Sequence, residues 1–231
     1  EFFKLDSEFV TVDIDISSVN DIPNSYAIDL KQYIWATDDY YQHIDLSGDD
    51  VDFPDLQFHF LPVAMDYDGK DQHRGHGFQV HVGPMKPSSR GTVKLRSSDP
   101  KISPVVRFNY NESERDREVM RRGIRIARRI VRQSPFDAYR GTELRPGSSV
   151  DSDRGLDAFI QQYAESAYHP SCTCRMGVDE GAVVNQRGLV NGVSGLRIVD
   201  ASIMPEITNG NLNAVVIMMA EKISEVIRQS N

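Results

Sequence analysis

Cysteine, tryptophan and long apolar runs are scarce in this sequence of 231 residues. Its two cysteines, Cys172 and Cys174, stand two positions apart, where strand geometry separates them too far for a disulfide. So few thiols favour a reducing compartment. No apolar run approaches the roughly 20 residues of a membrane-spanning helix, and no basic-then-apolar leader directs secretion. We therefore expect a cytoplasmic protein without a membrane span, with peripheral membrane contact as the alternative.

The net charge of −8 is unevenly distributed along the chain. Residues 1–50 hold twelve acidic residues against two lysines, a net charge of −10, so the rest of the chain carries +2. This break predicts a boundary near residue 50, with an acidic N-terminal segment of unknown origin before it. The segment is interpreted as a solvated acidic edge, and attraction of a cationic substrate is the alternative.

Hydrophobic residues make up 39% and charged residues 26% of the chain, as in ordinary globular proteins. Short alternating or turn-bounded apolar runs predict strands at residues 8–18, 56–62, 78–82, 92–96 and 105–108. Helical spacing of apolar residues predicts helices at residues 113–132, at 155–167, and from the 208–214 segment to about Arg228. Ser113 or Asn111 is available to cap the first of these helices. The pattern predicts an α+β fold, a mainly antiparallel sheet with helices packed on one face.

Eight arginines lie in the predicted helix at 113–132, and six of them form a stripe over its later turns, namely Arg121, Arg122, Arg125, Arg128, Arg129 and Arg132. Such a stripe could meet nucleic acid or an anionic lipid surface. A solvated face whose arginines pair with neighbouring acids is the ordinary interpretation, and we expect no nucleic-acid partner.

Three segments of the final third carry the chemistry, and each has an ordinary explanation by itself. They are 168–177 (YHPSCTCRMG), 196–205 (LRIVDASIMP) and 208–214 (TNGNLNA). A histidine before proline is usually structural, and Gly-Asn-Leu-Asn before a helix is usually a cap and turn. His169, Cys172 and Cys174 lack the second ligand pair that a zinc site needs, so we predict no metal site.

Together the three segments resemble the C-terminal signature of the glucose-methanol-choline (GMC) oxidoreductases, in the family's order and at about its separations. The resemblance extends upstream to residues 58–62 (FHFLP) and 74–100, which look most like the choline-oxidising branch. It covers about residues 52–228. The fold it implies is the substrate-binding domain of the family over residues 51–168, followed at 169–231 by a catalytic and flavin-contacting segment. The C-terminal helix of that segment belongs to the flavin domain.

The resemblance also implies a reaction, oxidation of a small alcohol, with choline the foremost candidate, and an FAD cofactor that receives the hydride. His169 then takes the role of the base, since a neutral imidazole suits that role near neutral pH. Asn211 takes the second catalytic position, where a hydrogen-bond donor meets the developing alkoxide.

The remaining implied roles are cofactor contact for Asp200, Ala201 and Asn213, and substrate contact for His59. A complete member of the family begins with a GxGxxG turn that binds the dinucleotide, and this sequence contains none. We therefore expect an incomplete FAD site, a chain that is inactive alone, and a missing FAD-binding half as partner. The alternative is a non-catalytic binding or interaction module derived from the family.

Overall fold

The computed structural model describes residues 8–15, 54–65 and 76–229, so most of the predicted acidic segment lies outside the described part. The chain divides into two compact units. We call Phe9–Gly83 with Glu118–Ala164 the sheet unit, and Glu1–Glu8, Pro84–Arg117 and Glu165–Asn231 together the C-terminal unit. The boundaries that the sequence suggests, at residues 50 and 168, remain predictions.

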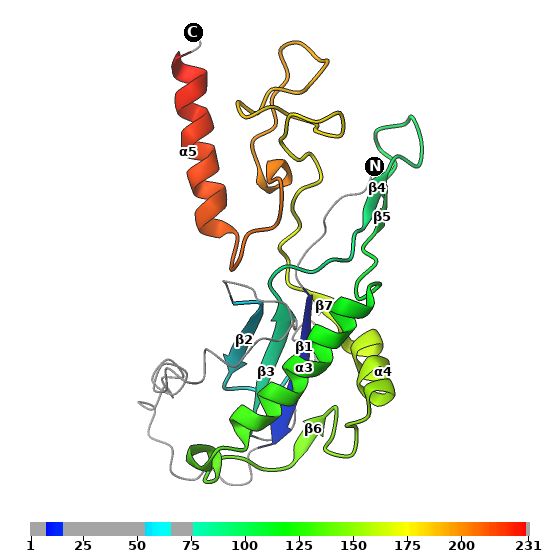
Figure 1. Cartoon of the computed structure of the whole chain (residues 1–231), viewed down its shortest axis with the longest axis vertical. Helices are drawn as coiled ribbons and strands as arrows, with labels where there is room; N and C mark the ends of the chain where they lie inside the picture. Colours follow the sequence, from blue (N-terminus) through cyan, green and yellow to red (C-terminus); the bar gives the residue numbers. More distant parts are fainter. Residues whose placement is uncertain (1–7, 16–53, 66–75, 230–231) are drawn as a thin grey trace. The chain divides into compact units, whose positions relative to one another are not determined.

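The sheet unit is built on strands in the order β2-β3-β1-β6 (Figure 1). These strands are β1 (Glu8–Asp15), β2 (Leu56–Leu61), β3 (Gly77–Pro84) and β6 (Glu143–Arg145). The long pair is antiparallel, with Val10 opposite Val82 and Asp15 opposite Gly77. The strands predicted around residues 8–18, 56–62 and 78–82 are therefore confirmed, whereas the three-residue β6 was not predicted.

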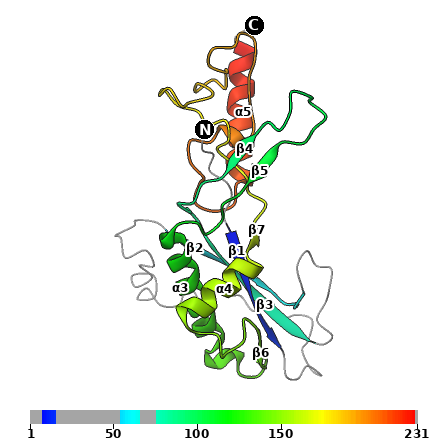
Figure 2. The ribbon, with the colours of Figure 1, turned by 90° about the vertical axis from the view of Figure 1, so that its right-hand side faces the viewer.

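Helices α3 (Glu114–Val131) and α4 (Asp153–Tyr163) cover one face of this sheet (Figure 2). Ser113 begins α3 as its N-cap, because its Oγ accepts a hydrogen bond from the Asp116 backbone N–H at 3.1 Å. The predicted helix at 113–132 is thus confirmed. Helix α4 ends four residues earlier than predicted, since Ala164 is extended and the short strand β7 (Glu165–Ser166) follows.

The core of the sheet unit lies between β3 and the two helices. Alternate β3 residues face α3 and α4, because successive strand side chains point to opposite faces. The buried side chains are Phe78, Val80 and Val82 from β3, Met120, Ile124, Ala127 and Val131 from α3, and Leu156, Phe159 and Ile160 from α4. Phe136, in the single-turn helix η2 (Ser134–Phe136), closes one end of this core with its ring centroid 5.9 Å from that of Phe78.

Gly123 lets α3 approach the sheet closely. A Cβ at this position would overlap Cγ1 of Val82, which is fully buried, and would stand 3.2 Å from Cδ1 of Leu56. We therefore expect Gly123→Ala to lower the free energy of unfolding by about 1–3 kcal/mol, the usual cost of overpacking a core. Urea titration of the two proteins would measure the difference.

A double variant separates this overlap from the other effects of alanine. In a Val82→Ala background the obstructing methyl is absent, so Gly123→Ala should be neutral or stabilising, because alanine favours helix by about 1 kcal/mol over glycine. An equal loss in both backgrounds would contradict the proposed close approach.

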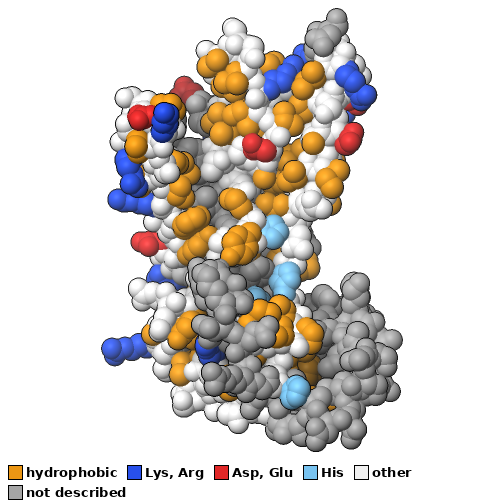
Figure 3. Space-filling model, turned by 180° about the vertical axis from the view of Figure 1, so that it is seen from behind, with side chains coloured by type: hydrophobic (Ala, Val, Ile, Leu, Met, Phe, Trp, Pro, Cys, Tyr) orange, Lys and Arg blue, Asp and Glu red, His pale blue; other side chains and the backbone are white. Residues whose placement is uncertain are grey.

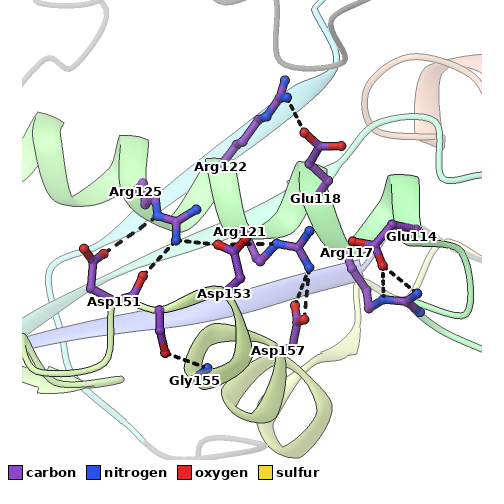
Figure 4. A network of polar contacts seen from close by, with 11 residues as sticks. Glu114, Arg117, Glu118, Arg121, Arg122, Arg125, Asp151, Asp153, Gly155 and Asp157 are labelled. Atoms are coloured by element: carbon purple, nitrogen blue, oxygen red, sulfur yellow. Dashed lines mark hydrogen bonds and ion pairs between the residues drawn. The ribbon is translucent and has the colours of Figure 1, made fainter.

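The arginines of α3 form ion pairs with acids on the same helix and around the start of α4 (Figure 4). Arg121 Nη1 lies 2.8 Å from Asp157 Oδ1, and Arg125 Nη2 lies 2.7 Å from Asp153 Oδ1. The predicted pairing with neighbouring acids is confirmed for Arg121, Arg122, Arg125 and Arg128. The face is less solvated than expected, however, because Arg121 and Arg128 are buried.

Arg128 is the most enclosed of these arginines, with a side chain only 5% exposed. Its Nη2 donates to Glu143 Oε1 on β6 at 2.7 Å and to the carbonyl of Val150 at 2.9 Å. Its Nη1 donates to Asp151 Oδ1 at 3.2 Å. One guanidinium therefore joins the end of α3 to β6 and to the loop before α4.

The C-terminal unit has less regular structure. Strands β4 (Thr92–Lys94) and β5 (Val105–Arg107) pair antiparallel, as predicted. A short 3-10 helix η3 (Ala201–Ile203) precedes the long helix α5 (Asn213–Gln229), which confirms the predicted C-terminal helix. The unit has its own buried cluster, formed by Cys172, Val184, Ile203, Met204, Ile207, Leu212, Met219 and Ile223.

Asp116, in the first turn of α3, holds the turn before β4. Its carboxylate accepts hydrogen bonds from the backbone and hydroxyl of Ser88, both at 2.8 Å, and from the backbone and hydroxyl of Ser89. Burial alone would raise the pKa of Asp116, but these four donors outweigh it and hold that pKa below its usual value.

Candidate functional site

His169 follows a tight turn at the start of the last third of the chain. The Tyr168 backbone N–H donates to Ser166 Oγ at 3.0 Å, and His169 Nδ1 forms a hydrogen bond with the carbonyl of Ala167. A carbonyl oxygen only accepts, so the neutral ring carries its proton on Nδ1. In this tautomer Nε2 carries the lone pair that can accept a proton.

Left-handed backbone flanks His169 on both sides. Tyr168 has φ of 59° and Cys172 has φ of 66°, values that residues with a Cβ adopt at a cost of order 1–3 kcal/mol each. Such outliers concentrate at functional sites, where the surrounding structure holds them in place. Here that support includes burial of Cys172, which is 3% exposed within the cluster of the C-terminal unit.

A ladder of backbone hydrogen bonds joins the segment after His169 to η3. The N–H groups of Cys172, Cys174 and Met176 donate to the carbonyls of Ala201, Ser202 and Ile203, at 3.2, 2.8 and 2.8 Å respectively. We call these three bonds the backbone ladder. They bring the predicted cofactor-contacting segment beside the segment of the predicted base.

Asp200 begins η3 as its N-cap. Its Oδ1 accepts a hydrogen bond from the Ser202 backbone N–H at 2.8 Å, and its own side chain is exposed. This local bond fixes the backbone conformation of the segment that includes Ala201. The structure therefore gives Asp200 a capping role, and contact with a cofactor remains a prediction.

Asn211 and Asn213 stand at the start of α5, on either side of a buried anchor. Leu212 is 5% exposed and packs in the same cluster as Cys172 and Ile203, whereas both asparagines are exposed. The Leu212 carbonyl accepts the first helical bond, from the Val216 N–H at 2.9 Å. The two amides thus lie at the helix N-terminus, which carries partial positive charge.

His59 belongs to the sheet unit, on β2. Leu56, Phe58 and Phe60 pack against the core, so the strand alternation places His59 on the opposite face. His81 on the neighbouring strand β3 occupies that face too, because Val80 and Val82 point into the core. No role was predicted for His81 or Gln79, and the only signal was that their strand alternates polar with apolar residues.

His81 is enclosed by polar groups on this face. Its Nε2 lies 2.5 Å from Gln79 Nε2, and Gln79 Oε1 accepts a hydrogen bond from the Met65 N–H at 2.8 Å. Burial, and secondarily the charge of nearby His59, lower the pKa of His81 from 6.5 to about 4. The ring is therefore neutral at physiological pH, and its Nε2 accepts a hydrogen bond from the Gln79 amide.

The lowered pKa of His81 predicts a loss of stability in mild acid. Between pH 6.5 and about 4, the His81 side chain binds a proton in the unfolded chain but remains neutral in the folded chain. The free energy of unfolding should therefore fall as the pH decreases through that window. We expect His81→Gln to flatten this fall in urea titrations at a series of pH values. His76→Gln, at an exposed histidine, is the control, and an unchanged pH dependence in His81→Gln would contradict the assignment.

Apolar side chains reach the surface of the C-terminal unit in several places (Figure 3). On α5, Ile217 and Met218 are 55% and 56% exposed, and Val193 and Leu196 in the preceding loop are 50% and 48% exposed. In the described part, no helix is long and apolar enough to cross a membrane. The described residues also include no group of three His, Cys, Asp or Glu side chains placed to hold a metal ion.

Comparison with known families identifies the chain. Residues 87–220 match the sequence profile of the GMC oxidoreductases, in the C-terminal part of that family. The chain belongs to the GMC oxidoreductase family. The match includes His169, Asp200, Ala201, Asn211 and Asn213, and the resemblance deduced from the three C-terminal motifs is confirmed.

Curated relatives of this GMC chain are named oxygen-dependent choline dehydrogenase. The protein of Yersinia pestis is 53% identical over 182 residues, 79% of this chain and 32% of the relative. That of Ectopseudomonas mendocina is 55% identical over 176 residues, 76% of this chain and 31% of the relative. The chain thus spans about a third of the length of these relatives.

Solved structures support the same architecture. Pyridoxine 4-oxidase from Mesorbium loti matches 97% of this chain and 43% of its own with a TM-score of 0.79 at 22% identity. Formate oxidase of Aspergillus oryzae, in a structure that concerns the effect of a mutation on FAD modification, matches 98% of this chain and 47% of its own with a TM-score of 0.79 at 20% identity. A fungal aryl-alcohol oxidase matches 66% and 25% with a TM-score of 0.60 at 32% identity. The predicted α+β fold of the GMC family is confirmed, and the roles of individual site residues remain predictions.

Proposed function

We propose that this chain forms the substrate-binding and catalytic portion of an FAD-dependent alcohol dehydrogenase that acts on choline or a similar small alcohol. The observation that carries the proposal is the hydrogen bond between His169 Nδ1 and the Ala167 carbonyl, which orients the ring and assigns its proton to Nδ1, so that Nε2 is the basic nitrogen. The relatives named choline dehydrogenase support the choice of substrate class.

The proposed division of labour follows from the chemistry of each group. His169 Nε2 removes the hydroxyl proton of the alcohol. The Asn211 amide donates a hydrogen bond to the oxygen as negative charge develops there. The partial positive charge at the α5 N-terminus stabilises that negative charge by about 0.3–1 kcal/mol. FAD, when bound, supplies the acceptor for the hydride. His59 on β2 contributes to holding the substrate.

The residues present fit the flavin ring of FAD better than the rest of the cofactor, its pyrophosphate and adenosine. Asn213 is exposed at the start of α5, Asp200 is the exposed N-cap of η3, and Ala201 is the first residue of η3, so a flavin ring could approach polar groups at both helix starts. The Gly-rich turn for the pyrophosphate has no counterpart in the sequence. We therefore propose that an FAD-binding half completes the site, and that the chain alone is inactive. A cytoplasmic location also remains a prediction.

Flavin retention tests this proposal directly. The purified chain is incubated with excess FAD and desalted, alone and after mixing with an FAD-binding half expressed from a GMC relative. We expect flavin absorbance and choline-dependent bleaching only in the mixture. A mixture that retains FAD but is not bleached by choline or other small alcohols would favour a non-catalytic binding module instead. FAD retained by the chain alone, with bleaching, would overturn the proposed need for a second half.

A further inference from the structure

The C-terminal unit contains two Asn-Gly pairs with contrasting surroundings, Asn191-Gly192 and Asn209-Gly210. Asn-Gly is the dipeptide most prone to lose the asparagine amide, because glycine has no Cβ to shield its backbone nitrogen from the asparagine side chain. Both glycines have positive φ, 77° at Gly192 and 101° at Gly210. The two pairs are thus alike in sequence and in the sign of the backbone angle.

Hydrogen bonding distinguishes the two asparagines. Asn191 Nδ2 donates to the carbonyl of Ala182 at 2.9 Å, and its backbone N–H donates to the carbonyl of Val183 at 2.9 Å. Asn209 is exposed, and within the described part of the chain no hydrogen bond holds its side chain. Deamidation requires the side chain to swing over the next backbone nitrogen. Asn191 must break a hydrogen bond to do so, and Asn209 need not.

We propose that Asn209 is a deamidation site of this protein and that it reacts faster than Asn191. The Gly210 nitrogen loses its proton and forms a bond to Cγ of Asn209. The bond from Cγ to the side-chain nitrogen breaks, and ammonia leaves with a proton. Water then opens the five-membered succinimide and leaves aspartate or isoaspartate at position 209. Water is the only co-reactant, and nothing is oxidised or reduced.

The product places a carboxylate two residues before Asn211. The isoaspartate form also adds a methylene to the backbone that leads into α5. Both changes oppose the role of Asn211, because a neighbouring negative charge disfavours a developing alkoxide and a longer backbone displaces the amide. This consequence rests on the proposed function, whereas the modification itself does not.

Mass spectrometry of the chain, incubated at mildly alkaline pH with and without urea, tests the site. We expect Asn209 to convert several times faster than Asn191 in the folded chain. In urea the two rates should converge, because unfolding releases Asn191. Each unit of pH should raise the rate at Asn209 about tenfold, since the attacking nitrogen must lose a proton far below its pKa. The variant Asn209→Gln should show no conversion at that position and an unchanged rate at Asn191.

Two results would overturn the proposal. One is conversion of Asn191 as fast as Asn209 in the folded chain. The other is an unmodified Asn209 in the folded chain under conditions where the urea-unfolded chain converts at both positions. The link to catalysis has its own test in the mixture with an FAD-binding half, where Asn209→Asp should lower kcat and Asn209→Ser should not. Equal kcat in both variants would refute that link and leave the modification site established by mass.

Discussion

Replacing His169 by Gln should lower kcat for alcohol oxidation by about 10²–10⁴-fold, the range that a positioned general base contributes. The protein measured is the mixture of this chain with an FAD-binding half. Glutamine keeps a hydrogen-bonding side chain but offers no nitrogen lone pair to take the proton. The loss should therefore fall on kcat more than on KM, because the interaction exists mainly in the transition state.

The separate effects on kcat and KM distinguish loss of the base from a displaced turn, because a displaced turn would weaken substrate binding as well and raise KM. The exposed His76→Gln variant serves as control and should keep both kcat and KM. Equal bound FAD in all three proteins ensures that the rates are comparable. Activity retained by His169→Gln would show that another group is the base.

Replacing Arg128 by Met should lower the free energy of unfolding by about 3–5 kcal/mol, the cost of breaking a buried ion pair by removing one partner. Methionine has a volume similar to that of arginine, so the loss of stability reports mainly the cost of leaving a buried carboxylate without its partner. The stranded group is Glu143, whose side chain is only 11% exposed. Two backbone carbonyls, of Gly147 and Val150, lose their donor as well. Urea titration gives the difference.

Arg125 provides a matched control on the same helix. Its ion pairs, with Asp151 and Asp153, involve carboxylates that are 71% and 64% exposed. We expect Arg125→Met to cost only about 0–1 kcal/mol, because exposed pairs are solvated and screened by salt. The double variant Arg128→Met with Glu143→Leu should recover part of the lost stability, since no buried charge remains. Equal losses in the two single variants would contradict the importance of burial.

Elements with local signals were predictable from the sequence, and those fixed by distant contacts were not. Helix α3 has apolar residues at helical spacing and a serine cap, and both signals are local. Strand β6 has three residues without alternation, and its place depends on pairing with Asp13 and Ile14, some 130 residues away. Helix α4 ends at Tyr163 although alanines continue the apolar pattern, because the backbone becomes extended at Ala164.

The candidate site shows the same limit. The resemblance to the GMC family placed roles on His169 and Asn211, and no spacing argument from the sequence could have done so. The hydrogen bond from His169 to the Ala167 carbonyl depends on the left-handed turn at Tyr168. Tyrosine is not a residue type that predicts a left-handed turn. His81 was missed because a histidine that alternates with valines along a strand has the pattern of an ordinary polar face.

The backbone ladder has a consequence for how the chain tolerates changes of length. Twenty-four residues, 177–200, lie between Met176 and Ala201 of the ladder, in a loop whose turns at Gly192 and Gly195 are exposed. Since the ladder holds the two ends of this loop together, residues inserted at those turns change its contour without moving either anchor. A deletion between Cys172 and Met176 would instead change the spacing of the donor N–H groups, so the three hydrogen bonds could no longer form together. Within the family, variation in length should therefore gather in the loop and be absent from the ladder.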